Sequence, residues 1–409
     1  MIRFSPGRLA LVALLWLLAS CASLKSSSPV TTILISIDGT HPKHLARLSS
    51  GTIRGLIDAG VQAEALLPVF PTKTFPNHYS QVTGLYPSGH GIVGNRMYDT
   101  VTNKRFDIAD RVAKQDSSWW WGEPIWVTAA KQNVKVATMF WPGSEAEIQG
   151  YTPFFWRPFD YQFKSAQRVD QVLQWLDQEP DLRLVTLYFE ESDVAGHLHG
   201  PTSPEFFQAL QRIDGHLGAL LSGLEERNRL SRTNIVIVSD HGMADTSAKR
   251  IVCLDDFVDA ESQWAGKSPV LMLWPKDEET VTKLRQAHPH VKVYGEAEFP
   301  AHWRLTDNQR VAPYVVVADE GWTMYNACKI GVPKINPGDH GYDNALLSMR
   351  GLFVASGPSF KNKVNIPAVN AVDIYELLCH LLSIKPAKND GSLSAFSKAL
   401  RDLDAAEAP

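Results

Sequence analysis

The chain has 409 residues, of which 44% are hydrophobic and 21% are charged, as in a globular protein that buries one or two large cores. Its formal net charge of −4 excludes a basic excess, and so argues against binding to the nucleic acid backbone as its main function. A small phosphorylated substrate is compatible with this charge.

The N-terminus is predicted to be an export sequence and not part of the fold. Arg3 and Arg8 lie beside an apolar run over residues 9–18, which is too short to span a bilayer stably. Residues 18–21 resemble the lipobox of bacterial lipoproteins, in which the cysteine becomes the lipidated first residue. We therefore expect a signal peptide over 1–20, a lipid anchor on Cys21 and a linker over 21–31. Ala22 after this cysteine indicates a periplasm-facing lipoprotein of the outer membrane, and a plain cleaved signal peptide is the alternative.

Short apolar runs alternate with helical patterns along the rest of the chain. The alternation predicts an α/β fold with a mostly parallel central sheet sandwiched by helices, in one catalytic domain over 32–385. The expected strands are 32–37, 134–140, 184–189, 235–238 and 352–355, and the expected helices are 166–176, 204–227 and 373–382. A less regular stretch over 255–336 is predicted to be a smaller inserted subdomain, and 386–409 a flexible tail.

Beyond Cys21 the chain contains three cysteines, Cys253, Cys328 and Cys379. An odd number in an exported protein predicts one disulfide and one buried thiol, without indicating which two pair. Their spacing matches no zinc-knuckle pattern, which excludes a metal site built from cysteines.

Metal-binding side chains gather at the ends of four predicted strands. The candidates are Asp38, Asp193, His197, Asp240, His241 and His340. One aspartate at a strand end is more often a turn or a helix cap. Carboxylates and imidazoles together suit zinc, and open α/β sheets bind ligands at the carboxyl ends of their strands. Two closely spaced metal ions need about six or seven ligands, so the sequence predicts a two-zinc site.

The segment from Pro71 to His78 supplies a hydroxyl just before a predicted helix. Thr74 would lie where backbone amides and the helix dipole favour an anion. A bound zinc ion can stabilise a threonine alkoxide, so we expect Thr74 to be both a ligand and the nucleophile. The alternative is an ordinary helix N-cap, a role that Thr72 would fill equally well. For the nearby His78, His90 and His199, hydrogen bonding or packing is the expected role.

Six motifs together resemble the nucleotide pyrophosphatase/phosphodiesterase family of the alkaline phosphatase superfamily. They are residues 37–39, 72–78, 83–87, 141–145, 240–243 and 340–344, and the resemblance runs in order from about 32 to 384. It implies an alkaline-phosphatase-like fold. It further implies one zinc on Asp193, His197 and His340, and the other on Asp38, Thr74, Asp240 and His241. Ser192 departs from the family, which usually has proline there.

The same resemblance implies a substrate site. Asn95 would donate a hydrogen bond to a phosphate oxygen, and Phe75 would stack on a nucleobase, with Phe159 or Trp156 as the opposing wall. The expected reaction cleaves nucleotide phosphodiesters or pyrophosphates to a nucleoside monophosphate through a phosphothreonine intermediate. Nucleic acid is not expected as a stable partner, and the oligomeric state stays open.

Two other functions fit parts of the pattern. A phosphodiesterase acting on choline-type lipid headgroups would use the same metals, and only a substrate panel separates it from a nucleotide enzyme. A non-catalytic metal-binding lipoprotein belongs to a different class, and it would need no hydroxyl beside the metal ligands. A sulfatase is excluded, because no Cys/Ser-x-Pro/Ala-x-Arg motif stands near Thr74.

Overall fold

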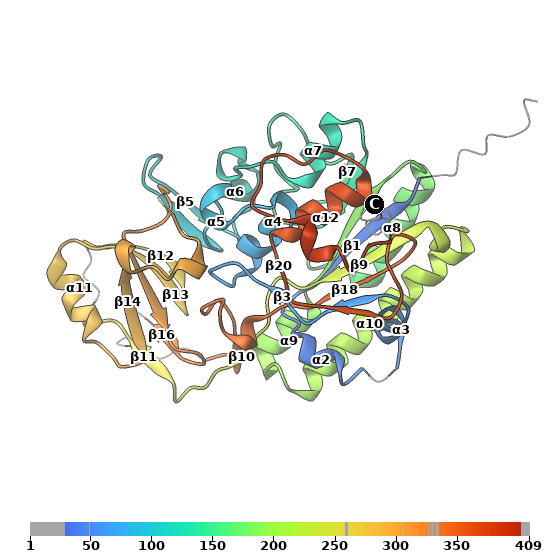
Figure 1. The fold of residues 1–409 in the computed structure, drawn as a ribbon. Coiled ribbons are helices and arrows are strands. Elements are labelled where there is room, and N and C mark those ends of the chain that lie inside the picture. The colour runs from blue at the N-terminus through green and yellow to red at the C-terminus, as the bar shows by residue number, and fades with distance from the viewer. Residues whose placement is uncertain are drawn as a thin grey trace, which may run out of the picture.

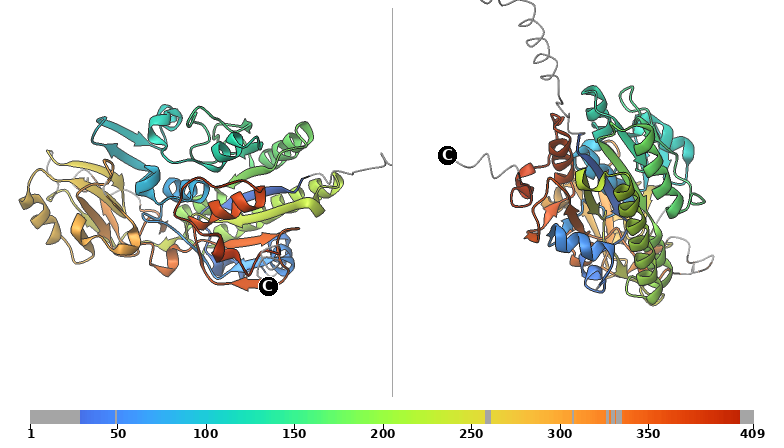
Figure 2. Two further views of the ribbon diagram at one scale, coloured as in Figure 1. Left: turned by 45° about the horizontal axis from the view of Figure 1, so that its top comes forward. Right: turned by 90° about the vertical axis from the view of Figure 1, so that its right-hand side faces the viewer.

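The structure is a computed structural model that describes residues 29–48, 50–257, 261–306, 308–325, 328, 331 and 335–401. A larger lobe contains most of the chain, and a smaller lobe projects from one end of it (Figure 1). Figure 2 shows the two lobes from two further directions. The predicted signal peptide and the Cys21 anchor lie outside the described residues. Within the described ranges, no helix has both the length and the apolar character needed to cross a bilayer.

An eight-stranded sheet forms the centre of the larger lobe, in the order β19-β2-β18-β9-β1-β8-β6-β7. Its strands are β1 (Thr31–Ile37), β2 (Val61–Ala63), β6 (Val136–Met139), β7 (Phe155–Trp156), β8 (Leu184–Phe189), β9 (Thr233–Val238), β18 (Phe353–Ser356) and β19 (Val364–Ile366). The strands from β9 to β7 run parallel, whereas β18 runs antiparallel to β9 and to β2. The predicted mostly parallel sheet is therefore confirmed. The sequence missed β2, β7 and β19, which are too short for a periodic pattern.

Helices cover both faces of this sheet (Figure 1). One face carries α4 (Thr74–Thr83), α7 (Ile125–Lys131) and α12 (Asp373–Leu382), and the other carries α3 (Thr52–Ala59), α8 (Ser165–Gln178), α9 (Glu191–His199) and α10 (Pro204–Glu226). The central strand β1 shows why both layers form. Leu34 joins the buried cluster on one side, while Ile33 and Ile35 join the cluster on the other. Each fully buried side chain of this kind contributes about 1.5–3 kcal/mol.

The start of α10 illustrates how the sequence sets a helix boundary. The Ser203 hydroxyl accepts a hydrogen bond from the Phe206 N–H at 3.1 Å, and Pro204 occupies the first helical turn. Buried residues then recur at helical spacing, including Leu210 and Leu217. Ser203→Ala would destabilise the fold by about 1 kcal/mol, because it removes the cap.

The smaller lobe is built on a four-stranded antiparallel sheet in the order β12-β13-β15-β14. Its elements are β12 (Gln263–Lys267), β13 (Val270–Trp274), α11 (Glu278–Arg285), β14 (Val291–Gly295) and β15 (Tyr314–Ala318), beside the parallel pair β11 (Ile251–Cys253) and β16 (Thr323–Tyr325). All four strands of the sheet fall within the stretch 255–336. This lobe has a buried cluster of its own, which includes Leu273, Leu284 and Val316.

Several shorter helices and strands complete the fold. They are α2 (Pro42–Leu45), β3 (Leu66–Leu67), α5 (Pro87–His90), β4 (Arg96–Asp99), β5 (Lys104–Asp107), α6 (Arg111–Gln115), β10 (Ala244–Asp245), β17 (Gly338–Asp339) and β20 (Val369–Asn370). The hairpin β4-β5 reaches the smaller lobe, where the Arg105 guanidinium donates to the Trp264 carbonyl at 3.0 Å. The lobes are thus connected by side-chain contacts as well as by the chain.

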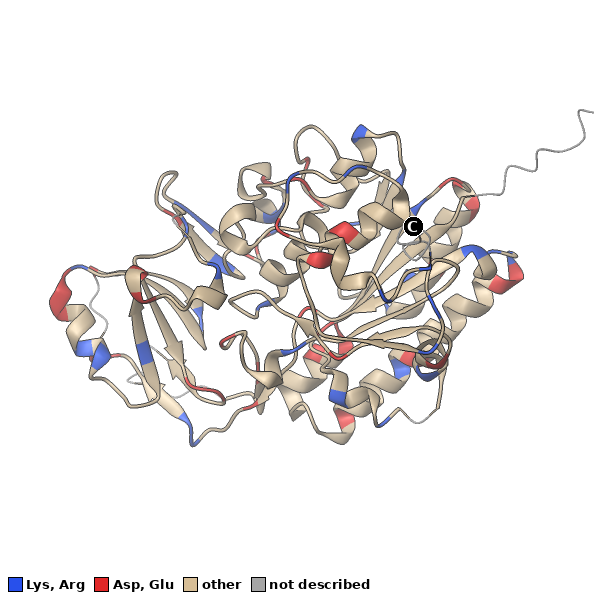
Figure 3. Ribbon diagram, viewed as in Figure 1, with Lys and Arg blue, Asp and Glu red and all other residues tan. Residues whose placement is uncertain are grey.

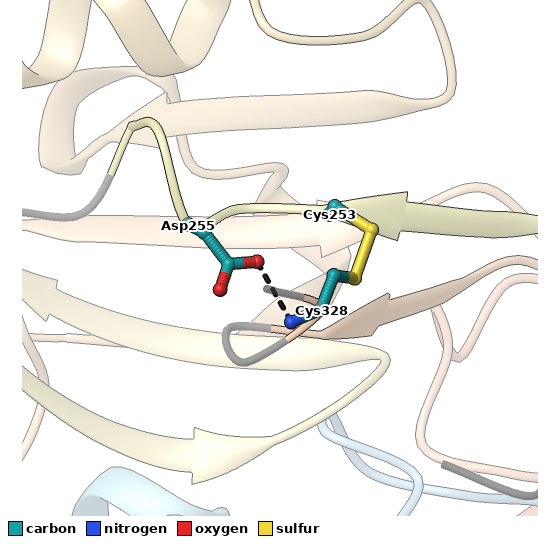
Figure 4. The surroundings of a disulfide bond; sticks show 3 residues. All are labelled: Cys253, Asp255 and Cys328. Carbon is teal, nitrogen blue, oxygen red and sulfur yellow. Dashed lines mark hydrogen bonds between the residues drawn. A yellow bond between two sulfur atoms is a disulfide. The ribbon is translucent and has the colours of Figure 1, made fainter. Parts of the chain in front are cut away.

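One disulfide joins Cys253, at the end of β11, to Cys328 (Figure 4). The Asp255 carboxylate accepts a hydrogen bond from the Cys328 N–H at 2.9 Å, which adds a second tie between the same two segments. Cys379 is a buried free thiol. The expectation of one disulfide and one buried thiol is confirmed, and the structure supplies the pairing that the sequence left open.

The expected flexible tail from residue 386 onward is wrong as far as residue 401. Phe396, Ala399 and Leu400 are buried against the larger lobe, and the Phe396 ring lies 5.3 Å from that of Phe353. The Arg401 N–H donates to the Ser359 carbonyl at 3.1 Å. Apolar residues at spacings of three and four bury enough surface to hold this segment, although small and charged residues separate them.

Charged residues of both signs are interspersed along the ribbon of both lobes (Figure 3). No single-sign face dominates in this view, in agreement with the formal net charge of −4. The absence of a stable nucleic acid partner remains a prediction, and the charge pattern gives no reason to change it.

Candidate metal and phosphoryl-transfer site

The carboxyl ends of three neighbouring parallel strands bring most candidate ligands to one edge of the sheet. β1 pairs in register with β8 and with β9, so these strands end side by side. Asp38 follows β1, and Asp240 and His241 follow β9. Helix α9 begins directly after β8 and carries Asp193 and His197. Strand alignment, and not proximity in the sequence, therefore assembles these groups.

His340 reaches the same edge from a distant part of the sequence. The strand β17, which ends one residue before His340, pairs antiparallel with β10, the next strand after β9 in the chain. The next sheet strand, β18, runs antiparallel and so begins at this edge. The His340 ring stacks on that of His241 with centroids 3.6 Å apart and an interplanar angle of 16°. The loop before β18 thus supplies a ligand to a site formed by strands that run the other way.

The structure brings all the predicted ligands together. His241 Nε2 lies 2.9 Å from Asp240 Oδ2 and 3.5 Å from Asp38 Oδ1. On the other side, Asp193 places Oδ2 at 3.5 Å from His197 Nε2 and Oδ1 at 3.7 Å from His340 Nε2. These two groups of contacts adjoin one another, since ligand atoms of Asp193, His241 and His340 lie within 4.8 Å of each other.

The three histidines share one tautomer. In each, Nδ1 faces a backbone carbonyl, which can only accept, so Nδ1 carries the proton: the carbonyls are those of Gly338 for His197, Thr72 for His340 and Gly242 for His241, at 2.8, 2.8 and 2.9 Å. Nε2 is therefore the ring nitrogen that faces the carboxylates. Metal-binding histidines are oriented in this way.

The carboxylates also fit a bound cation. Asp38 Oδ1, Asp193 Oδ1 and Asp240 Oδ2 are buried and accept no hydrogen bond. Burial, followed by repulsion from Asp240 and Asp193, raises the pKa of the Asp38 carboxyl well above its usual value. Unpaired carboxylates so close together are unfavourable in a buried site, and metal ions would remove both the repulsion and the unmet hydrogen bonding. The donor set therefore fits a metal centre.

Two further side chains lie near the ligands but are already engaged in hydrogen bonds with neighbouring residues. His78 is near Asp38 and Asp240, but its Nδ1 faces the Thr74 carbonyl at 2.9 Å and its Nε2 faces the Ser36 hydroxyl at 2.8 Å. Asp339 accepts from the His340 N–H at 2.8 Å. Both positions hold neighbouring residues in place, which is the role that the sequence indicated for His78.

The other two histidines near the motifs also stay away from the ligand cluster. His90 is buried, with Nε2 at 2.9 Å from the Ser80 hydroxyl and Nδ1 accepting from the Ile92 N–H at 3.1 Å. His199 is exposed at the C-terminal end of α9.

Thr74 is the first residue of α4, and its Oγ1 lies 3.4 Å from His241 Nε2. The preceding Lys73 gives the helix no side-chain cap. Thr72 is not a cap either, because its hydroxyl donates to the Tyr342 carbonyl at 2.9 Å and accepts from the Gly341 N–H. Neither Lys73 nor Thr72 therefore caps the helix start beside the Thr74 hydroxyl, where the helix dipole favours an anion.

Asn95 faces the same helix start with a defined orientation. Its Oδ1 accepts from the Phe75 N–H at 3.0 Å, and since a backbone N–H can only donate, the amide nitrogen must be the opposite end. Asn95 is half-buried and lines the cavity that contains Thr74. Its Nδ2 is thereby oriented as a neutral donor, which the predicted contact with a phosphate oxygen requires.

A cavity of about 620 Å³ opens over Thr74, Asp38 and Asp193. Phe75 and Phe159 both line it, as the sequence predicted. The alternative prediction, that Trp156 forms the opposing wall, is wrong. This residue belongs to the edge strand β7, paired with Thr138, and does not line this cavity. The aromatic residues that the sequence did not assign to the walls are Trp120, Phe140, Trp141, Tyr161 and Tyr188.

Three supporting residues were missed in the sequence. The Tyr188 hydroxyl donates to Asp38 Oδ2 at 2.6 Å, and the Ser192 hydroxyl donates to the Asp38 carbonyl at 2.6 Å. Ser192, the departure from the family pattern, thus contributes a hydrogen bond that proline could not make. Lys73 is half-buried, and its ammonium donates to the carbonyls of His340 and Ser268. Its position beside Thr74 in the motif was the only available signal.

The comparisons with known proteins agree with this geometry. A family model described as type I phosphodiesterase / nucleotide pyrophosphatase matches residues 32–343. Bis(5′-adenosyl)-triphosphatase enpp4 of Xenopus laevis is 38% identical over 398 residues, which are 95% of this chain and 86% of that protein. Ectonucleotide pyrophosphatase/phosphodiesterase family member 3 of Bos taurus is 36% identical over 392 residues, but this chain spans only 44% of its length.

Solved structures show the same similarity. Murine ectonucleotide pyrophosphatase / phosphodiesterase 5 superposes with a TM-score of 0.87 at 34% identity, covering 91% of this chain and 100% of that one. An inactive form of the same murine protein, in complex with AMP, superposes with a TM-score of 0.86.

Proposed function

Because the chain belongs to the type I phosphodiesterase / nucleotide pyrophosphatase family, we propose that it hydrolyses nucleotide phosphodiesters and pyrophosphates to a nucleoside monophosphate with two zinc ions. The family makes it a metal-dependent phosphodiesterase. The observation that carries the proposal is one cavity lined by Thr74, by metal-binding side chains, by the oriented amide of Asn95 and by the aromatic ring of Phe75. The names of the relatives and the AMP complex of the murine protein support a nucleotide.

We assign the ligands of the two ions in two groups. One ion would be held by Asp193, His197 and His340, and the other by Asp38, Thr74, Asp240 and His241. Mixed imidazole and carboxylate ligands favour zinc over magnesium, which prefers oxygen ligands throughout. When bound, the ions would offset the negative charge of the carboxylates and lower the pKa of the Thr74 hydroxyl and of a water molecule.

The reaction proceeds in two displacements at phosphorus. The Thr74 oxygen, having lost its proton, attacks phosphorus in line; the bond to the leaving oxygen breaks, and the leaving group takes up a proton. Water then attacks the phosphothreonine, the nucleoside monophosphate departs, and Thr74 regains its proton. Two inversions give net retention of configuration. The Asn95 amide donates to the phosphate oxygen that gains charge, and the start of α4 favours the same anion.

Aromatic residues provide the binding site for the nucleoside. Phe75 follows the nucleophile directly, and Phe159 lies on the same cavity. The Phe159 ring is fixed by edge contacts with Phe140 and Tyr188, at centroid distances of 5.1 and 6.0 Å. Stacking between aromatic rings accepts any base, so the enzyme would discriminate weakly among nucleobases.

A substrate panel tests this proposal against a choline-type diesterase. The panel is p-nitrophenyl phosphate, the p-nitrophenyl ester of thymidine monophosphate and p-nitrophenyl phosphorylcholine, each with and without a chelator. We expect fast, chelator-sensitive hydrolysis of the thymidine diester only. Preferential hydrolysis of p-nitrophenyl phosphorylcholine would instead indicate a phosphodiesterase that acts on choline-type lipid headgroups. Full zinc binding without hydrolysis of any ester would favour a non-catalytic protein.

We also propose that the chain is exported and anchored through Cys21, facing the periplasm from the outer membrane. The support is the charged start, the short apolar run and the lipobox-like residues 18–21. Growth with radiolabelled palmitate should label the mature protein, and Cys21→Ser should abolish the label. If the wild-type protein carried no label, the lipid anchor would be wrong, and a plain cleaved signal peptide would be the remaining interpretation.

A further inference from the structure

A second cavity of about 350 Å³ adjoins the first on the other side of Asn95. The two cavities share Asn95, His197 and His340, so the phosphate site lies where they meet. If the nucleoside occupies the first cavity, the leaving group extends into the second. The lining of this second cavity therefore bears on which leaving groups the enzyme accepts.

Both lobes contribute walls to the second cavity. The larger lobe supplies Lys73, Arg96 and Asp107. The smaller lobe supplies Lys267, at the end of β12, and Ser268, in the turn that leads to β13. The cavity continues into a further space of about 530 Å³, which is also lined by Arg96, Lys267 and Trp264. The two spaces together leave room for a leaving group larger than one phosphate.

The three cationic side chains along this groove differ in the ion pairs and hydrogen bonds that they already form. Arg96 pairs with Asp107 at 2.8 Å, and the Lys73 ammonium lies 3.6 Å from Asp339 and donates to two carbonyls. Lys267 is exposed, and its side chain forms no hydrogen bond or ion pair with any described residue. Its charge is therefore available to an anion in the groove.

The turn that carries Lys267 is fixed relative to the nucleophile. The Lys73 ammonium, one residue before Thr74, donates to the Ser268 carbonyl at 3.1 Å. The Ser268 hydroxyl in turn accepts from the Met324 N–H at 2.9 Å. Gly266 has φ of +99°, and a Cβ there would lie 2.8 Å from the Val270 carbonyl oxygen, so the turn is tight. The backbone next to Lys267 is thus tied to the segment that carries Thr74.

We propose that this second cavity binds the leaving group and that Lys267 contacts negative charge beyond the scissile phosphorus. The inference rests on the proposed function and specifies it. Loss of Lys267 should then slow turnover of substrates with phosphorylated leaving groups more than turnover of esters whose leaving group carries no phosphate. Lys267 acts on selectivity and takes no part in bond making, since no covalent step is assigned to it.

The test compares two substrates that differ in their leaving groups. ATP releases an anionic pyrophosphate, and the p-nitrophenyl ester of thymidine monophosphate releases a phenol without phosphate. In Lys267→Met, we expect the ratio of kcat/KM for ATP to kcat/KM for the ester to fall about tenfold, because a charge-assisted contact is lost. Lys267→Arg should restore most of the ratio. An unchanged ratio in Lys267→Met overturns the proposal.

The matched control is Lys292→Met on β14 of the same lobe. Lys292 is exposed and lies 3.5 Å from Asp319, and it lines neither cavity of the groove. Its removal should leave the ratio as in the wild type. A similar fall in both variants would indicate a general effect of surface charge and would also overturn the assignment to Lys267.

A binding measurement separates this inference from the proposed function. Calorimetry with AMP and with adenosine 5′-(α,β-methylene)triphosphate requires no turnover. Lys267→Met should weaken binding of the triphosphate analogue about tenfold relative to AMP. If the wild type hydrolyses no nucleotide but this difference is present, the proposed reaction fails and the anion site stands. If hydrolysis occurs and the difference is absent, the anion site fails alone.

Discussion

The metal-binding edge of the sheet and the walls of the substrate cavities are built in different ways. The edge consists of short motifs directly after strands, with Asp38 and Asp240 both almost fully buried. The walls come from loops and from both lobes, as with Phe159 and Lys267, and they remain partly exposed. One region is therefore fixed by the alignment of strands, and the other by contacts between distant segments.

This difference separates chemistry from selectivity. Changes at the edge should affect the rate for every substrate, because all substrates present the same phosphorus to Thr74. Changes in the walls should affect one class of substrate more than another. Each of the following experiments tests whether the two regions can be separated in this way.

Thr74→Ala should have the largest effect and should act at the edge alone. Removal of the attacking oxygen is expected to lower kcat by about 10⁴-fold or more on every substrate. Zinc content, measured by mass spectrometry, should fall only partly, since the other ligands remain. Thr74→Ser keeps the hydroxyl and should retain measurable turnover. Full activity in Thr74→Ala would end the proposal that this residue is the nucleophile.

The sequence predicted the edge far better than the walls. Asp38 and Asp240 were identifiable because each follows an apolar run that predicts a parallel strand. The carboxyl ends of neighbouring parallel strands lie at the same edge of the sheet. His340 was identifiable from its motif, although only the antiparallel course of β18 explains how it reaches the site. Ser192 and Tyr188 were missed because a hydroxyl that supports a ligand has no sequence pattern of its own.

The failures in the walls and in the fold have a common cause. Trp156 and Phe159 are close in sequence and similar in character, and only the structure shows that Trp156 belongs to the edge strand β7 while Phe159 lines the cavity. Lys267 reaches the cavity because a turn of the smaller lobe packs on Lys73. The tail up to residue 401 packs because Phe396 and Leu400 find an apolar surface. Each depends on a partner far away in the sequence.

Metal removal should affect the edge next most strongly. A chelator should abolish hydrolysis of all substrates and lower the unfolding temperature, because Asp38, Asp193 and Asp240 would be left uncompensated. At free zinc about 1,000 times its Kd, binding contributes about 4 kcal/mol to the free energy of unfolding. Zinc should restore both activity and stability, and magnesium should not, since the site contains three imidazoles. Recovery with magnesium alone would contradict the assignment of zinc.

Asn95 lies between the metal-binding edge and the cavity walls, so its substitution tests whether the two regions have separate roles. Asn95→Ala removes a donor directed at the phosphate, and kcat should fall by about 10²- to 10³-fold for every substrate. Asn95→Asp keeps an acceptor for the Phe75 N–H but replaces the donor with a carboxylate, so it should be no better. Steady-state kinetics on ATP and the thymidine diester measure both variants. A fall in kcat for only one of the two substrates would indicate that Asn95 contributes to substrate selectivity and not to the chemical step.

The smallest effect is expected within the walls, where Phe159 and Trp156 form a natural pair for comparison. Phe159→Ala removes a ring that lines the nucleoside cavity and should raise KM about tenfold, with a smaller change in kcat. Trp156→Ala removes a larger ring from the edge strand β7, so KM should stay the same even if the unfolding temperature falls. Measuring KM and thermal unfolding for both variants separates binding from stability. If Trp156→Ala raised KM as much as Phe159→Ala, the wall would extend to the sheet edge, and the division between the two regions would have to be redrawn there.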